Sequence, residues 1–213
     1  MSGPAIVAVN HTSIADVPAV LATLFTRGLR PSVPCGGDGC GRDHGHIRFL
    51  AASQVFRTPI IGNFARSSGM IEVGWRQAGT VALKAAREAL ERAEIVGIYP
   101  EGALQANADG SPRRFRYGIG RLALDTGVPI IPIAHHDARR IGSGTIGRSL
   151  LGAMTAIVRR PTIRLRVGPP IGSEEYAGLP VRDVVQLVQA RVTTVWESIA
   201  APQRTPAPPE KLL

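Results

Sequence analysis

The chain has 213 residues, enough for a single domain to bury a sizeable core without disulfides or a structural metal. Only 5% of the residues are aromatic, so a surface that stacks on exposed nucleic-acid bases is not expected. The formal net charge is +9, and almost all the cationic side chains are arginines, which match phosphate with paired hydrogen bonds. This bias favours a phosphorylated ligand or an anionic membrane surface as partner. No helix concentrates the basic residues and no nucleic-acid reading motif is present, so nucleic acid is not expected.

The sequence contains no apolar run long enough to cross a bilayer. Val128–Ala134 is short and carries two prolines, and Leu150–Val158 is interrupted by Gly152. The first residues, Met1–Pro4, lack the basic and apolar regions of a signal peptide. We therefore predict a cytoplasmic protein that is peripheral at the inner face of the membrane.

The turn Asn10–Asp16 is the first stretch that carries chemistry. It follows a short β-branched run, Ala5–Val9, which predicts a buried strand, and it precedes Val17–Phe25, whose apolar residues have helical spacing. This order places His11 at the mouth of a strand-to-helix turn and Asp16 in the first turn of the helix. The carboxylate can then fix the tautomer of the imidazole and leave its other nitrogen free as a general base.

The same residues also have a purely structural interpretation. Ser13 with Asp16 three positions later has the form of a capping box, in which the carboxylate satisfies free amides at a helix start. His11 would then be an ordinary turn residue. The motif on its own does not decide between the two interpretations.

A polar, glycine-rich stretch from Gly28 to Gly45 follows the first helix and predicts a loop. With the residue after it, this stretch carries the residue types of a zinc site. Their spacing matches no established zinc pattern, and a disulfide is not expected in the cytoplasm. We predict a flexible insertion without a metal. The weak metal candidates are Cys35, Cys40, His44 and His46.

The rest of the chain alternates between strand and helix patterns. Apolar runs predict strands, whereas apolar residues spaced three and four apart predict helices. The stretch from Asp137 to Arg160 is less regular and predicts a loop and an amphipathic helix. The predicted strands are Ile47–Ala52, Met70–Val73, Ile95–Tyr99, Val128–Ala134 and Thr162–Val167, and the predicted helices are Thr58–Arg66, Gln77–Ala93, Tyr117–Thr126 and Val181–Ile199.

This alternation predicts an α/β fold, a single domain with a mostly parallel mixed sheet flanked by helices. We assign the domain to residues 1–200, and the Pro-rich segment 201–213 predicts a disordered tail. Gly127 is typical of the position just after a helix. Pro132 has no amide to donate, which predicts a sheet edge or a bulge.

The strand Ile95–Tyr99 ends in Pro100, Glu101 and Gly102. In open α/β sheets ligands bind beyond the carboxyl ends of the strands. Glu101 and His11 both follow such ends, so we expect them to share one crevice. A plain turn with a solvated glutamate is the alternative.

Three arginines, Arg113, Arg114 and Arg116, stand immediately before the helix predicted from Tyr117. Guanidinium groups beside unpaired helix amides would form an anion site. A solvated basic loop is the alternative, and the residues alone favour neither interpretation.

Taken in order, these motifs resemble the glycerolipid acyltransferase family, the group of 1-acylglycerol-3-phosphate acyltransferases. The likeness extends from about Pro4 to Ile199 and includes Arg166–Pro170 at a strand end. Three ordered motifs at suitable separations are more specific than any one of them. They are Asn10-His11 with Asp16, Tyr99-Pro100-Glu101-Gly102, and Val128-Pro129-Ile130-Ile131-Pro132-Ile133.

The resemblance implies roles for these residues. His11 would be the general base and Asp16 the residue that orients it, while Glu101 and Gly102 would help to organise the acceptor. The hydroxyl of a lysophospholipid would attack the thioester carbonyl of acyl-CoA or of an acyl-carrier protein. The family implies no covalent enzyme intermediate, and we expect no cofactor beyond this co-substrate.

Two departures from the family pattern affect phosphate ligands. Relatives continue Pro-Glu-Gly as Thr-Arg-Ser, whereas Leu104 stands here in place of the arginine, and Trp75 replaces the arginine of a second block. We predict that Arg76 and the cluster Arg113–Arg116 substitute for the lost contacts. The alternatives are an acceptor without a phosphate, or a non-catalytic lipid-binding protein that retained the fold.

Overall fold

A computed structural model describes residues 3–13, 16–25, 30–31, 46–74, 78–102, 107, 109–136 and 163–200. Within them, the strands are β1 (Ala5–Val9), β2 (Arg30–Pro31), β3 (His46–Ala52), β4 (Ile71–Val73), β5 (Ile95–Ile98), β6 (Ile130–His136) and β7 (Arg164–Val167). The helices are α1 (Asp16–Phe25), α2 (Ser53–Arg57), α3 (Pro59–Ser67), α4 (Ala78–Glu91), α5 (Gly118–Thr126), α7 (Ser173–Tyr176) and α8 (Val181–Ala200).

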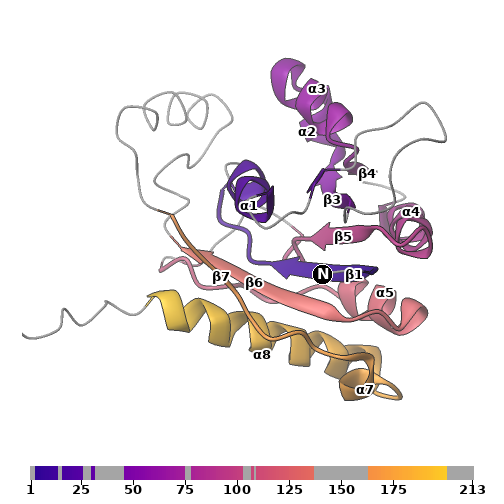
Figure 1. Ribbon diagram of the computed structural model, residues 1–213, viewed down its shortest axis with the longest axis vertical. Coiled ribbons are helices and arrows are strands. Elements are labelled where there is room, and N and C mark those ends of the chain that lie inside the picture. Colours follow the sequence, from indigo (N-terminus) through magenta and orange to yellow (C-terminus); the bar gives the residue numbers. More distant parts are fainter. Residues whose placement is uncertain are drawn as a thin grey trace, which may run out of the picture.

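The strands form one sheet in the order β2-β3-β5-β1-β6-β7, and β4 pairs with the end of β3 (Figure 1). All neighbouring strands are parallel except β6 and β7, which are antiparallel. The predicted α/β class with a mostly parallel mixed sheet is therefore confirmed. Because β1 lies between β5 and β6, the turns that follow these three strands meet at one edge of the sheet.

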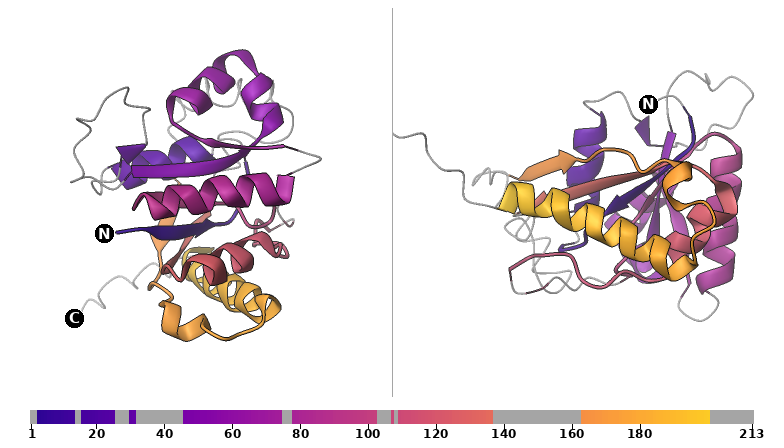
Figure 2. Two further views of the ribbon diagram at one scale, coloured as in Figure 1. Left: turned by 90° about the vertical axis from the view of Figure 1, so that its right-hand side faces the viewer. Right: turned by 90° about the horizontal axis from the view of Figure 1, so that it is seen from below.

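Helices cover both faces of the sheet, because successive side chains of a strand point to opposite sides. Ile6 and Ala8 of β1 belong to a buried cluster with α4, α5 and α8. Val7 and Val9 belong to a second cluster, which contains residues of α1. The views in Figures 1 and 2 show the same arrangement, with α8 lying along β6 and α1 on the opposite side. Among the described helices, none is both long and apolar enough to cross a bilayer.

Several predicted boundaries are close to the observed ones. The strand predicted at Ala5–Val9 has these same bounds, and Gly127 ends α5 with a left-handed φ of 64°. The short elements α2, α7 and β2 were not predicted, because two to five residues are too few to show a period. The stretch from Asp137 to Arg160 and the predicted tail 201–213 lie outside the described residues.

The expectation of a sheet edge at Pro132 is wrong, because β6 has strands on both sides. A bulge is present, but in the segment that pairs with β6 and not at Pro132 itself. The paired positions Ile133–Val167 and Ile130–Ile171 leave two residues of β6 opposite the three residues Gly168–Pro170. The amide of Gly168 donates to the carbonyl oxygen of Pro132 at 2.8 Å. The irregular segment Gly168–Pro170 therefore lies beside Pro132, which has no amide hydrogen to donate.

Candidate active site

The first motif folds back on itself at the carboxyl end of β1. Nδ1 of His11 lies 3.0 Å from Oδ2 of Asp16, which is fully buried. Since an ionised carboxylate only accepts hydrogen bonds, Nδ1 carries the proton in this contact. In the neutral ring Nε2 is then unprotonated, and no hydrogen bond joins it to the described part of the chain. This is the arrangement of a base held by a carboxylate.

Asp16 also has the structural role considered above. Its Oδ2 accepts the backbone amides of Thr12 at 2.5 Å and Ser13 at 2.8 Å, and its Oδ1 accepts the Thr12 hydroxyl at 3.2 Å. The catalytic and the capping interpretations are therefore compatible, because one carboxylate makes both sets of contacts. Burial opposes its ionisation, but hydrogen bonds from His11 and His135 outweigh burial and hold the pKa of Asp16 well below its usual range.

The imidazole of His11 is also held by an aromatic neighbour. It stacks on the ring of Tyr99 with centroids 4.2 Å apart, and Tyr99 in turn packs on Phe49. The His11 side chain keeps 16% of its surface exposed. The ring is thus fixed in orientation but remains accessible to a substrate.

Glu101, at the end of β5, contacts the same turn through the backbone. Its Oε1 accepts the amide of His11 at 2.9 Å, and its Oε2 is buried. Burial, assisted by the charge of Asp16, raises the pKa of Glu101 to about 7, against the opposing effect of the His11 and Arg113 amides. The carboxyl group therefore holds the backbone of the base through its Oε1.

Arg116 lies against the Pro-Glu-Gly turn. Its Nε donates to the carbonyl oxygen of Glu101 at 3.2 Å, and its amide donates to the carbonyl oxygen of Pro100 at 2.8 Å. Gly102 has a φ of 69°, and a Cβ there would lie 2.5 Å from Nε of Arg116. A glycine at this position therefore permits both the turn and the close approach of the guanidinium group.

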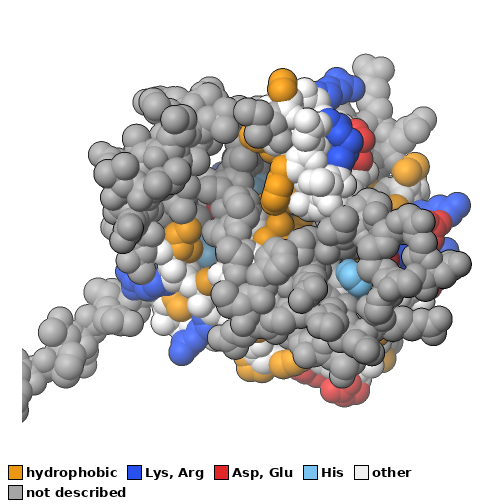
Figure 3. Space-filling view, turned by 45° about the horizontal axis from the view of Figure 1, so that its top comes forward, with side chains coloured by type: hydrophobic (Ala, Val, Ile, Leu, Met, Phe, Trp, Pro, Cys, Tyr) orange, Lys and Arg blue, Asp and Glu red, His pale blue; other side chains and the backbone are white. Residues whose placement is uncertain are grey.

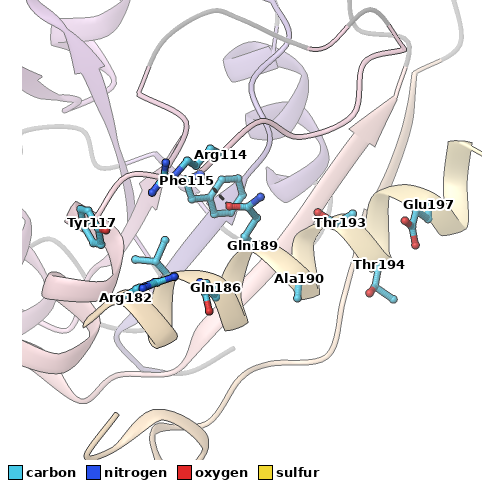
Figure 4. A pocket seen from close by; sticks show the side chains of 11 residues that line it. Arg114, Phe115, Tyr117, Arg182, Gln186, Gln189, Ala190, Thr193, Thr194 and Glu197 are labelled. Carbon is cyan, nitrogen blue, oxygen red and sulfur yellow. Dashed lines mark hydrogen bonds between the residues drawn. The ribbon is translucent and has the colours of Figure 1, made fainter. Parts of the chain in front are cut away.

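Arg114 points elsewhere. It lines a cavity of about 600 Å³ between the segment 114–117 and α8, together with Tyr117 at the start of α5 (Figure 4). His11, Asp16 and Glu101 do not line this cavity. The other lining residues are Phe115, Arg182, Val185, Gln186, Gln189, Ala190, Thr193, Thr194 and Glu197. The predicted arginine cluster is thus divided, with Arg116 at the turn and Arg114 in a separate cavity.

One side chain of the candidate site was missed in the sequence. His135, near the end of β6, is 1% exposed and places Nε2 at 3.4 Å from Oδ2 of Asp16. The strand-end rule that indicated Glu101 could have found it, but a strand ending at Ala134 left both following histidines unassigned. Because both histidines are polar, the apolar run was taken to end at Ala134, whereas the strand continues to His136.

Several predicted residues cannot be placed. Arg76, Trp75, Leu104, Cys35, Cys40 and His44 lie outside the described residues. His46 is the first residue of β3 and pairs with Arg30 of β2. Within the described ranges, no three His, Cys, Asp or Glu side chains are grouped as a metal site would need. The metal question and the role of Arg76 stay predictions.

Comparison with known proteins defines the class. The fold is similar to that of the 1-acyl-sn-glycerophosphate (LPA) acyltransferase PlsC from Thermotoga maritima, with a TM-score of 0.63 and 18% sequence identity. This similarity covers 95% of this chain and 68% of that one. The model of the Acyltransferase family matches residues 1–136, so the chain belongs to this family of acyltransferases. The resemblance predicted from the three motifs is confirmed.

Two sequence relatives match this chain at low identity. The 1-acyl-sn-glycerol-3-phosphate acyltransferase of Bacillus subtilis strain 168 is 23% identical over 137 residues, which is 64% of this chain. An uncharacterized protein of Mycobacterium tuberculosis strain H37Rv is 28% identical over 136 residues, or 61% of this chain. The matched regions span 60% and 32% of the lengths of these two relatives.

Proposed function

We propose that this protein is an acyl-thioester-dependent O-acyltransferase that acylates the hydroxyl group of a lysophospholipid in phospholipid biosynthesis. The observation that carries the proposal is the contact of 3.0 Å between His11 Nδ1 and Asp16 Oδ2, beside a partly exposed ring. Membership of the acyltransferase family supports the reaction class. The acceptor type, a 1-acylglycerol-3-phosphate, is suggested by the names of the Bacillus subtilis and Thermotoga maritima proteins.

In the proposed reaction, Nε2 of His11 removes the proton from the acceptor hydroxyl. The oxygen then attacks the thioester carbonyl of acyl-CoA or of an acyl-carrier protein, so that a C–O bond forms and the C–S bond breaks. The leaving thiolate takes the proton from the imidazolium. Asp16 keeps Nδ1 protonated and stabilises the transient positive charge of the ring.

Glu101 acts at two points in this proposal. Its contact with the His11 amide fixes the backbone that carries the base. Its carboxyl group also helps to organise the acceptor. This retains the role in acceptor binding that the resemblance implies and adds a role in positioning His11.

The first experiment measures acyl transfer by the purified protein, with acyl-CoA and acyl-carrier protein as donors and a panel of lysolipids as acceptors. His11→Ala and Asp16→Asn should each lower kcat by about 10²- to 10⁴-fold, the usual contribution of general base catalysis. Asp125→Asn, an exposed carboxylate of α5 paired with Arg121, is the matched control. Full activity of His11→Ala would eliminate this base. Liposome binding without turnover on any donor would favour the non-catalytic lipid-binding alternative.

The second experiment tests how the acceptor phosphate is held. We propose that Arg116, with Arg76, binds this phosphate in place of the arginines lost at Leu104 and Trp75. A charged hydrogen bond contributes about 1.5–3 kcal/mol, so Arg116→Ala should raise the acceptor KM roughly ten- to a hundredfold. The position of Arg116 at the Pro-Glu-Gly turn supports this expectation.

Three further arginine variants complete this test. Arg76→Ala should raise the acceptor KM in the same way, whereas Arg87→Ala, on the exposed face of α4, should leave it unchanged. Arg114→Ala shows whether the cavity beside α8 also contributes. If Arg76, Arg114 and Arg116 can all be replaced without effect, these arginines are solvated surface, and the acceptor lacks a terminal phosphate.

A further inference from the structure

Two buried residues join β1 to β6 directly behind the candidate base. The Asn10 side-chain amide donates to the carbonyl oxygen of His135 at 3.1 Å, and the His135 amide donates to the Asn10 side-chain oxygen at 2.9 Å. Asn10 is fully buried and His135 is 1% exposed. These reciprocal bonds fix the backbone of His135 relative to the turn that carries His11.

The imidazole of His135 directs its Nε2 at two acceptors. Its Nε2 lies 2.7 Å from the carbonyl oxygen of Asn10 and 3.4 Å from Oδ2 of Asp16. Because both neighbours are acceptors, Nε2 carries a proton. Nδ1 is buried and has no hydrogen-bond partner among the described residues. His135 is therefore a donor whose Nε2–H meets the carbonyl oxygen of Asn10, with Oδ2 of Asp16 as a second, more distant acceptor.

Among the described residues, the other hydrogen-bond donors to the Asp16 side chain come from its own turn. Thr12, Ser13 and His11 all lie within five residues of it, so they move with the turn if the turn moves. His135 belongs to another strand and approaches Asp16 from the sheet. This contact therefore holds the Asp16 carboxylate in place relative to the sheet, and not only relative to its own turn.

We propose that His135 is a positioning residue for the pair His11–Asp16. Its Nε2–H, held between Asn10 and Asp16, fixes the carboxylate at the place from which it meets Nδ1 of His11. The effect on catalysis rests on the proposed function, whereas the effect on the His11 ring does not. His135 itself touches no substrate in this proposal.

Two pairs of variants test the role of the donor. Gln places an amide nitrogen near the position of Nε2, whereas Leu has a similar size and no donor. His135→Leu should lower kcat by about 10- to 100-fold, with the KM of both substrates within about twofold of the wild type, as expected for loss of an orienting contact. His135→Gln should recover most of this loss. His136→Leu removes the neighbouring histidine, which faces Trp196, and should leave kcat unchanged.

If His135→Leu does not fold, His135→Asn replaces it, because the shorter amide reaches the position of Nδ1 and not that of Nε2. Asn should then lose kcat where Gln retains it. Equal kcat in folded variants with and without the donor would overturn the proposal. A parallel loss in Gln and in Leu or Asn would also overturn it, since it would show a requirement for the ring and not for the Nε2 donor.

A spectroscopic measurement tests the same idea without turnover. In protein labelled with ¹⁵N-histidine, the His11 signals, assigned with His11→Ala, should show a single tautomer protonated at Nδ1. His135→Leu should give mixed tautomers or broadened signals, while His135→Gln should resemble the wild type. Unchanged His11 signals in folded His135→Leu would overturn the proposal, even if no acyl-transfer activity were found for any form of the protein.

Discussion

Two carboxyl groups of opposite character share the candidate site. Asp16 is buried but surrounded by donors, so its pKa lies below its ordinary value and it stays ionised. Glu101 is buried with fewer donors and beside the charge of Asp16, so its pKa is raised to about 7. Environments that separate two carboxyl groups in this way give them different tasks. Asp16 is suited to a permanent negative charge beside His11, and Glu101 to a group that is partly protonated near neutral pH.

The raised pKa of Glu101 predicts a specific dependence of stability on pH. Between the ordinary glutamate pKa and about pH 7, the folded protein holds a proton that the unfolded chain has released. The free energy of unfolding therefore receives this contribution in full below the ordinary pKa, and loses it as the pH rises through about 7. Glu101→Gln should remove a decline of the order of 1–3 kcal/mol between pH 5 and 8, measured by urea denaturation. Glu91→Gln, on the exposed face of α4, should retain the decline, and an equal decline in Glu101→Gln would contradict the assignment.

At the scale of the elements, the packing of α5 fixes the end of the arginine-bearing segment 113–117. Two glycines of α5 show how closely this helix packs on α8. A Cβ on Gly120 would lie 2.8 Å from the carbonyl oxygen of Val181 and from a methyl group of Val185, both on α8. A Cβ on Gly118, in the first turn of the same helix, would meet only a methyl group of Leu83 at 3.8 Å. Alanine at position 118 therefore tests helix propensity alone, whereas alanine at position 120 also tests packing against α8.

Gly120→Ala should destabilise the protein by about 1–2 kcal/mol. Overpacking against backbone costs more than the gain of up to about 1 kcal/mol expected from replacing a helical glycine. Gly118→Ala should be neutral or stabilising by a few tenths to about 1 kcal/mol. Thermal unfolding of the two variants is the measurement. A higher Tm for Gly120→Ala than for the wild type would mean that α5 and α8 are not in close contact.

For the whole molecule, the net charge of +9 predicts attraction to an anionic bilayer. The helices α2 and α3 add an apolar contribution, since Phe64 of α3 is 43% exposed. They also add charge, because Arg57 and Arg66 are exposed. Figure 3 shows apolar and basic side chains close together over this part of the surface. A surface that combines both types is suited to the interface of a bilayer that carries a lipid acceptor.

Sedimentation with lipid vesicles tests this attraction. Binding to vesicles that contain phosphatidylglycerol should weaken as salt rises, because the Debye length falls from about 10 Å at 0.1 M to about 3 Å at 1 M. Vesicles of phosphatidylcholine alone should bind less protein at low salt. Equal binding to both kinds of vesicle at every salt concentration would mean that apolar contacts, and not charge, hold the protein at the membrane.

The sequence alone determined the features that are local. Ala5–Val9 is a continuous apolar run, α4 and α8 have clear helical periods, and Gly127 adopts a left-handed turn, so each could be predicted from neighbouring residues. The pairing of His11 with Asp16 was predictable for the same reason, because they are five positions apart and belong to one turn.

The tertiary structure decided the contacts between distant residues. His135 and Asn10 are 125 positions apart, and they meet because β1 lies between β5 and β6, an order that no local period encodes. The same order brings the Glu101 carboxylate to the His11 amide and not only to a substrate. It also divides the arginines, since the path of residues 113–117 between the Pro-Glu-Gly turn and α8 directs Arg116 to the turn and Arg114 to the cavity. Side-chain direction along an extended segment depends on what packs on each side, and the packing partners lie elsewhere in the chain.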